Sequence, residues 1–82
     1  MNLYLVTPIE SQDEYDYFEH LVVAATSAGD ARRTHPSDAP ISQWELHSQW
    51  VSRPSNALAT KIGTAEPGTY AGIVCSSYNS SY

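Results

Sequence analysis

Residues 56–78 read NALATKIGTAEPGTYAGIVCSSY, and this stretch predicts two strands joined by a turn. In its first part Leu58 and Ile62 alternate with small or charged side chains, which is the two-residue period of a half-buried strand. Pro67 and Gly68 fit the central positions of a type II turn, because proline presets φ at the first and glycine accepts a positive φ at the second. The apolar run that follows is the return strand, so the sequence predicts a β-hairpin here.

Two further strands are predicted in the N-terminal third. Residues 3–7 are β-prone and stop at Pro8, which cannot donate to a ladder. Apolar residues resume over 18–25, and that run is short and rich in β-branched side chains, which favours a strand over a helix. The acidic stretch between them has no apolar periodicity and is predicted to be a solvated loop.

A short helix is predicted after the second strand. Ser27 and Asp30 have the spacing of a capping box, with Asp in place of the usual Glu or Gln. The helix would carry residues 31–34 and end at His35, because the residue before a proline avoids the α region. A helix of this length is unstable alone, so it must pack on the sheet.

Residues 36–55 are predicted to form a long loop that contains two tryptophans. Pro40 is acceptable at a first helical position, so a second short helix over 41–49 is an alternative. Trp44 and Trp50 fit two roles. Large aromatic side chains in the loop of a small protein anchor it to the core, or they remain available to cover a sheet edge or a partner.

The elements therefore follow the order β-β-α-loop-β-β, which predicts an α+β domain with a mainly antiparallel four-stranded sheet and one short helix on a face. The 82 residues fit a single domain over 1–82, with a frayed tail at 79–82. The pattern does not specify the strand order.

The net charge and the single cysteine indicate which kind of partner and which cellular compartment to expect. The formal net charge of −5 disfavours binding to nucleic acid or to anionic membranes and favours a basic partner. We expect a cytoplasmic protein, because residues 1–6 lack a basic signal-peptide start and no run approaches about 20 apolar residues. Cys75 has no cysteine to pair with inside the chain and is predicted to be a small core residue in a reducing compartment.

The sequence lacks the motifs that would predict an enzyme or a metalloprotein. No serine lies in a G-x-S-x-G context beside a histidine. The candidate metal ligands His20, His35, His47 and Cys75 are scattered without ligand-like spacing. We therefore expect no enzymatic activity, no cofactor and no metal.

Two motifs resemble a known family. The pattern A-R-x-x-H-P-S at 31–37 and G-I-V-C-S-S-Y-N at 72–79 resemble a family of very small proteins encoded by tailed bacteriophages and prophages, and the resemblance covers nearly the whole chain. The chain departs from it by ending Ser80-Ser81-Tyr82, where the family often has Ala-Gly, and by having fewer acids at the helix start. The resemblance implies a non-structural accessory protein made in the bacterial host cytoplasm. Such proteins frequently bind host proteins, and they include anti-CRISPR proteins and inhibitors of host polymerases or nucleases.

An acidic and aromatic segment is the predicted binding surface. Five of the nine acids fall within residues 10–19, interleaved with aromatic side chains. The carboxylates can imitate the phosphate spacing of a nucleic acid and occupy a basic groove on a host protein, while the aromatics act as anchors. The predicted contact residues are Glu10, Asp13, Glu14, Tyr15, Asp16, Tyr17, Glu19, Trp44 and Trp50.

Two alternatives to this inhibitor hypothesis remain at the level of sequence. The acidic segment can be a solvated loop whose aromatics pack on their own sheet. The protein can also be a small structural or assembly module that homodimerises through an exposed sheet edge or through the surface around Trp44 and Trp50. Monomer and homodimer are therefore both open.

Overall fold

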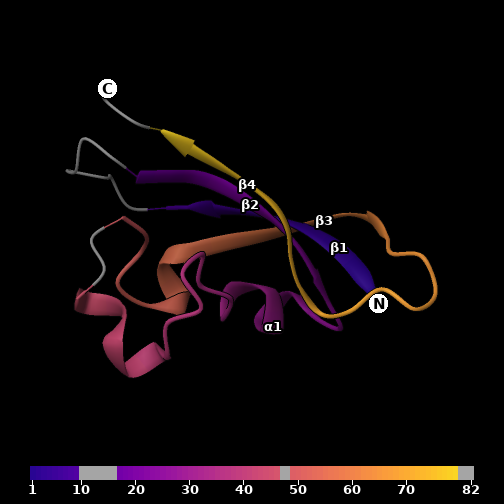
Figure 1. Cartoon of the computed structure of the whole chain (residues 1–82), viewed down its shortest axis with the longest axis horizontal. Coiled ribbons are helices and arrows are strands. Elements are labelled where there is room, and N and C mark those ends of the chain that lie inside the picture. The colour runs from indigo at the N-terminus through magenta and orange to yellow at the C-terminus, as the bar shows by residue number, and fades with distance from the viewer. Residues whose placement is uncertain (10–16, 47–48, 80–82) are drawn as a thin grey trace.

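The computed structural model describes residues 1–9, 17–46 and 49–79. Its strands are β1 (Asn2–Pro8), β2 (Tyr17–Ala25), β3 (Ala57–Thr64) and β4 (Gly72–Asn79). Its helices are α1 (Ala28–Arg32) and two 3-10 helices, η1 (Ile41–Leu46) and η2 (Pro54–Asn56). Figure 1 shows the sheet with the helices on one side of it, so the predicted α+β class with a four-stranded antiparallel sheet is confirmed.

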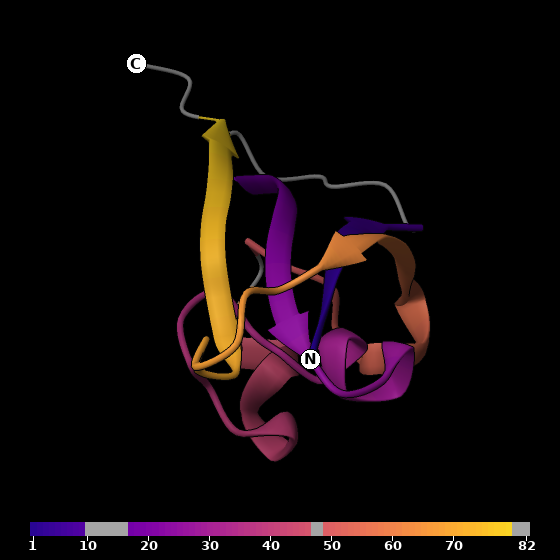
Figure 2. The ribbon, with the colours of Figure 1, turned by 90° about the vertical axis from the view of Figure 1, so that its right-hand side faces the viewer.

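The strands lie in the order β3-β1-β2-β4, and all neighbours are antiparallel. Leu5 of the central strand β1 lies opposite Val22 of β2 and opposite Thr60 of β3. Val22 in turn lies opposite Cys75 of β4. In Figure 2 the outer strands β3 and β4 stand on opposite sides of the β1–β2 pair.

The predicted hairpin between the last two strands is wrong. β3 and β4 form the two opposite edges of the sheet, and residues 65–71 cross its end between them, where Ala65 N donates to Met1 O at 3.0 Å. Figure 1 shows this connection projecting beyond β1 and β3 before it returns to β4. The physical reason is that β1 and β2 pair with each other and leave one free edge each, which the two later strands occupy.

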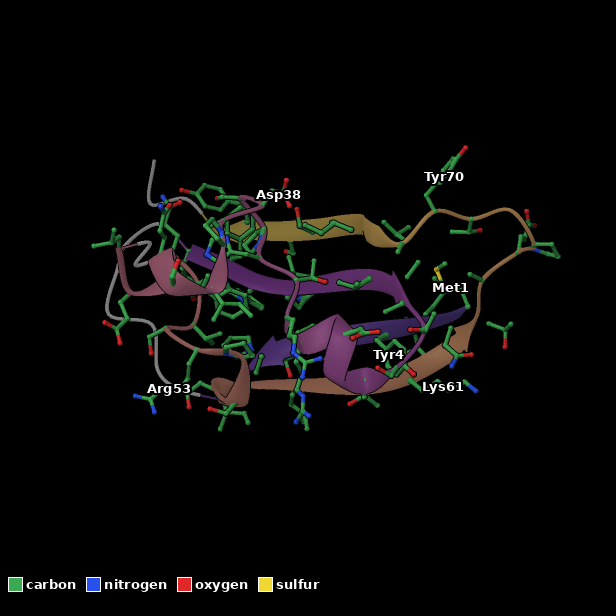
Figure 3. All side chains as sticks on the ribbon, turned by 90° about the horizontal axis from the view of Figure 1, so that it is seen from below. Met1, Tyr4, Asp38, Arg53, Lys61 and Tyr70 are labelled. Carbon is green, nitrogen blue, oxygen red and sulfur yellow. The ribbon has the colours of Figure 1, made fainter. Side chains whose placement is uncertain are left out.

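The turn inside this connection is confirmed. Thr69 N donates to Glu66 O at 3.1 Å, and Gly68 has a φ of 88°, as the third position of a type II turn requires. The turn reverses the chain direction locally, and the longer connection around it carries the chain to the far edge. Figure 3 shows Tyr70 on this connection pointing away from the molecule.

The substitution Gly68→Ala is expected to lower the free energy of unfolding by about 1–2 kcal/mol, because an L-residue is strained at this positive φ. Gly63→Ala is the matched control. A Cβ at either glycine meets open space, but Gly63 is not at a positive φ. Alanine in strand β3 should leave stability unchanged or raise it by up to about 1 kcal/mol. Urea unfolding of both variants tests this, and equal losses would contradict it.

Helix α1 begins at the predicted cap but is shorter than predicted. Ser27 Oγ accepts a hydrogen bond from Asp30 N at 3.2 Å, and the Asp30 carboxylate accepts one from Thr26 Oγ1 at 2.8 Å. The helix spans only Ala28–Arg32, and its buried residue is Ala31. It packs on β1, β2 and β3, which supplies the stabilisation that such a short helix needs.

The core lies between the sheet and the segment that connects β2 to β3. Alternate residues of the two central strands are buried on this face, as the strand period requires. They meet side chains from α1, η1 and the loop after η1. The buried cluster comprises Tyr4, Val6, Leu21, Val23, Ala25, Ala31, Trp44, Trp50, Val51 and Ala57.

Candidate protein-binding surfaces

Most of the acidic segment lies outside the described residues, including the predicted contacts Glu10, Asp13, Glu14, Tyr15 and Asp16. The structure does describe both places where the segment joins the sheet. It follows Ile9, just after the end of β1, and it precedes Tyr17, the first residue of β2. Because β1 and β2 are adjacent antiparallel strands, both attachments lie at the same end of the sheet.

The start of β2 presents the described part of the segment. Glu19 is exposed, and it lies where the register with β4 shifts between Phe18 and His20. Bulges of this kind redirect a side chain, which here leaves Glu19 in solvent. Tyr17 is half-buried. Two predicted contacts, Tyr17 and Glu19, are therefore described and accessible at this end of the sheet.

Phe18, which lies between Tyr17 and Glu19 in the sequence, has a structural role. Phe18 packs against the core, and its ring centroid lies 4.8 Å from that of Tyr78 on β4. Phe18 N donates to Gln49 O at 3.0 Å, and Gln49 Nε2 donates to the Tyr78 hydroxyl at 3.0 Å. For Phe18, packing on its own sheet is the correct interpretation. Its partners are distant in sequence, so only the strand register reveals them.

The predicted contact role of Trp44 and Trp50 is wrong. Their exposed fractions are 0% and 3%, so neither side chain is available to a partner. Trp44 Nε1 donates to Ala39 O at 3.0 Å, and its ring centroid lies 5.2 Å from that of His35. The tryptophans hold the described parts of this loop, residues 36–46 and 49–55, onto the sheet, which is the anchor role considered for them from the sequence.

The described cations lie apart from β4. Arg33, the C-cap residue of α1, pairs with Asp30 of that helix at 3.3 Å, and both side chains are more than half exposed, so this pair adds little stability. Figure 3 shows Arg53 beside η2, just before β3 begins, and Lys61 on β3. Strand β4 itself carries no charged residue.

An exposed surface on β4 was not predicted from the sequence. Ile73, Val74, Cys75 and Ser76 are consecutive and exposed, and Tyr78 is also exposed. We call these five residues the β4 surface. The prediction that Cys75 is a core residue is wrong, because its strand lies at the sheet edge and outside the covering layer.

The described residues include no group of side chains placed to hold a metal ion. Across residues 1–9, 17–46 and 49–79, no three His, Cys, Asp or Glu side chains are grouped as metal ligands would be. His35 is buried, and its Nδ1 accepts a hydrogen bond from Ser37 N at 3.0 Å, so this histidine orders the loop after α1. No helix in this part of the chain has the length and apolar character to cross a membrane.

Comparison with protein-family models, with curated proteins and with solved structures finds no match to this chain. Two surfaces of the molecule carry candidate binding residues: the end of the β1–β2 pair where the acid-rich segment attaches, and the β4 surface.

Proposed function

We propose that this protein is a non-enzymatic phage accessory protein that acts in the host cytoplasm. It binds and inhibits a host protein with a basic surface. The proposed target is a CRISPR–Cas complex or another complex that handles nucleic acid. The observation that supports this proposal is the attachment of the acid-rich segment to two adjacent central strands at one end of the sheet, beside the exposed Glu19.

Attachment at both ends favours binding through this segment. A charged segment held between paired strands loses less conformational freedom on binding than a free tail of the same composition. Its carboxylates raise the association rate with a basic groove, and this effect weakens as salt increases. The half-buried Tyr17 offers a partner an aromatic contact at low entropic cost.

A charge-matched pair of variants tests the proposal. Glu10→Gln, Glu14→Gln and Asp16→Asn remove three charges from the segment. Glu45→Gln, Glu66→Gln and Asp38→Asn remove three charges from exposed positions elsewhere. Host proteins captured on immobilised wild-type chain are purified, and their affinities for all three forms are measured at low and physiological salt. The segment variant should bind about tenfold more weakly or worse at low salt, with a smaller salt dependence. The control variant should bind nearly as wild type.

Competition by nucleic acid supplies the second measurement. If the segment occupies a nucleic-acid groove, a duplex oligonucleotide should displace the chain from the captured host protein. Equal binding by both charge variants, or binding unaffected by the oligonucleotide, would contradict the proposed mechanism.

A further inference from the structure

Strand β4 has a neighbour on one side only. It pairs with β2, and its other side is an edge of the sheet. Figure 2 shows β4 at the outer side of the sheet, away from α1, which packs on the other three strands. The β4 surface is thus exposed on a strand whose outer backbone N–H and C=O groups have no strand to pair with among the described residues.

Edge strands usually carry features that prevent pairing with another chain, such as a lysine, a proline or a bulge. The opposite edge, β3, has Lys61 and a register irregularity beside it. Residues 72–79 read GIVCSSYN and contain neither a charge nor a proline. The register with β2 shifts twice along β4, between the positions of Ile73 and Cys75 and between those of Ser77 and Tyr78. Between the two shifts, residues 75–77 form a regular, uncharged part of the edge.

We propose that β4 pairs antiparallel with the β4 of a second copy of this chain, about a two-fold axis normal to the sheet near Cys75 and Ser76. The two sheets then form one continuous sheet of eight strands, and the covering layers of both copies lie on the same face. A two-fold axis brings the same patch together from both copies, and an antiparallel edge satisfies that condition. With the axis at Cys75 or at Ser76, the exposed Val74 of one copy lies opposite Ser76 or Tyr78 of the other copy.

The distribution of charge makes β4 the place where a second copy can approach. Each chain has a net charge of −5, so two copies repel each other wherever acids meet. Strand β4 is uncharged and lets their backbones approach without opposing carboxylates. The edge offers no cation to an acidic partner and no carboxylate to a basic one. The identical strand is therefore the partner that matches its chemistry.

Light scattering and sedimentation over a dilution series, from about 1 to 300 µM, test the proposal in the range expected for a small interface. The mass should rise from 9.0 kDa toward twice that value. Val74→Lys should weaken association about tenfold or more, because it places two like charges at the pairing edge. Leu58→Lys is the matched control on β3. Val74 and Leu58 are 55% and 53% exposed, and the control should associate as wild type.

Cysteine cross-linking tests the geometry in the wild-type chain and does not depend on how the lysine variants fold. Cys75 is the only cysteine. In the proposed pairing its two copies lie directly opposite or on a diagonal, at most about 8 Å apart, so a short bis-maleimide should link them. A monomer at every concentration would overturn the proposal. So would a dimer that Cys75 does not link, or one that Leu58→Lys dissociates and Val74→Lys leaves intact.

Discussion

Trp44→Ala is expected to lower the free energy of unfolding by about 3–5 kcal/mol. The indole is fully buried between the sheet and the loop, and truncation leaves a cavity that a short covering segment cannot fill. It also removes the hydrogen bond to Ala39 O and the ring contact with His35. Domains of this size have about 5–15 kcal/mol of stability, so the variant should unfold at much lower urea concentration.

Two conservative variants separate packing from hydrogen bonding in this experiment. Trp44→Phe keeps an aromatic ring but loses the N–H that bonds to Ala39 O. Trp50→Phe makes the same change where the buried Nε1 has no hydrogen-bond partner among the described residues. Because removing an unpaired buried donor costs little, Trp50→Phe should be the more stable variant by about 1 kcal/mol. Urea unfolding followed by far-UV circular dichroism measures all three. A Trp44→Ala loss below about 1 kcal/mol would contradict the anchor role.

The strands were predictable because each has a local signal. Alternation marks β3, a β-branched run marks β2, and Pro8 ends β1. The order of the strands was not predictable, because alternation shows only that side chains alternate between two faces. It specifies neither which strand lies beside another nor, in β3, which face is buried, since Leu58 and Ile62 are exposed and Ala57 is buried. The Pro67-Gly68 turn therefore suggested a hairpin, although the same turn serves in a longer connection between the two edges.

The candidate surfaces show the same limit. The Ile73-Val74-Cys75 run has the composition of a buried strand, and only the strand order shows that it lies at an edge. For the two tryptophans the sequence favoured the anchor role but also allowed a contact role, because burial depends on what the loop covers. The concentration of acids at 10–19 was visible directly in the sequence, since local charge density needs no tertiary information.

Leu21→Ala is the second large loss expected, at about 2–5 kcal/mol. Leu21 is fully buried in the central strand β2, where it lies opposite Val6 of β1 and Ser76 of β4. Its truncation opens a cavity in the layer on which the covering loop packs. Strands on both sides hold the backbone in place, so the site cannot collapse to fill that cavity. The loss of unfolding free energy should therefore be well above the transfer free energy of the removed side-chain atoms alone.

The chain supplies the control for this prediction in Leu58, which makes the same Leu→Ala change possible at an exposed position on β3. Leu58→Ala should alter stability by no more than about 0.5 kcal/mol, as is usual for surface positions. Urea unfolding of the two variants at one low protein concentration compares them without any contribution from association. Equal losses would mean that the covered face is not where the apolar burial of this fold is concentrated. A large loss of unfolding free energy in Leu58→Ala alone would mean that the core lies on the other face of the sheet. The strand residues described as buried and those described as exposed would then exchange places.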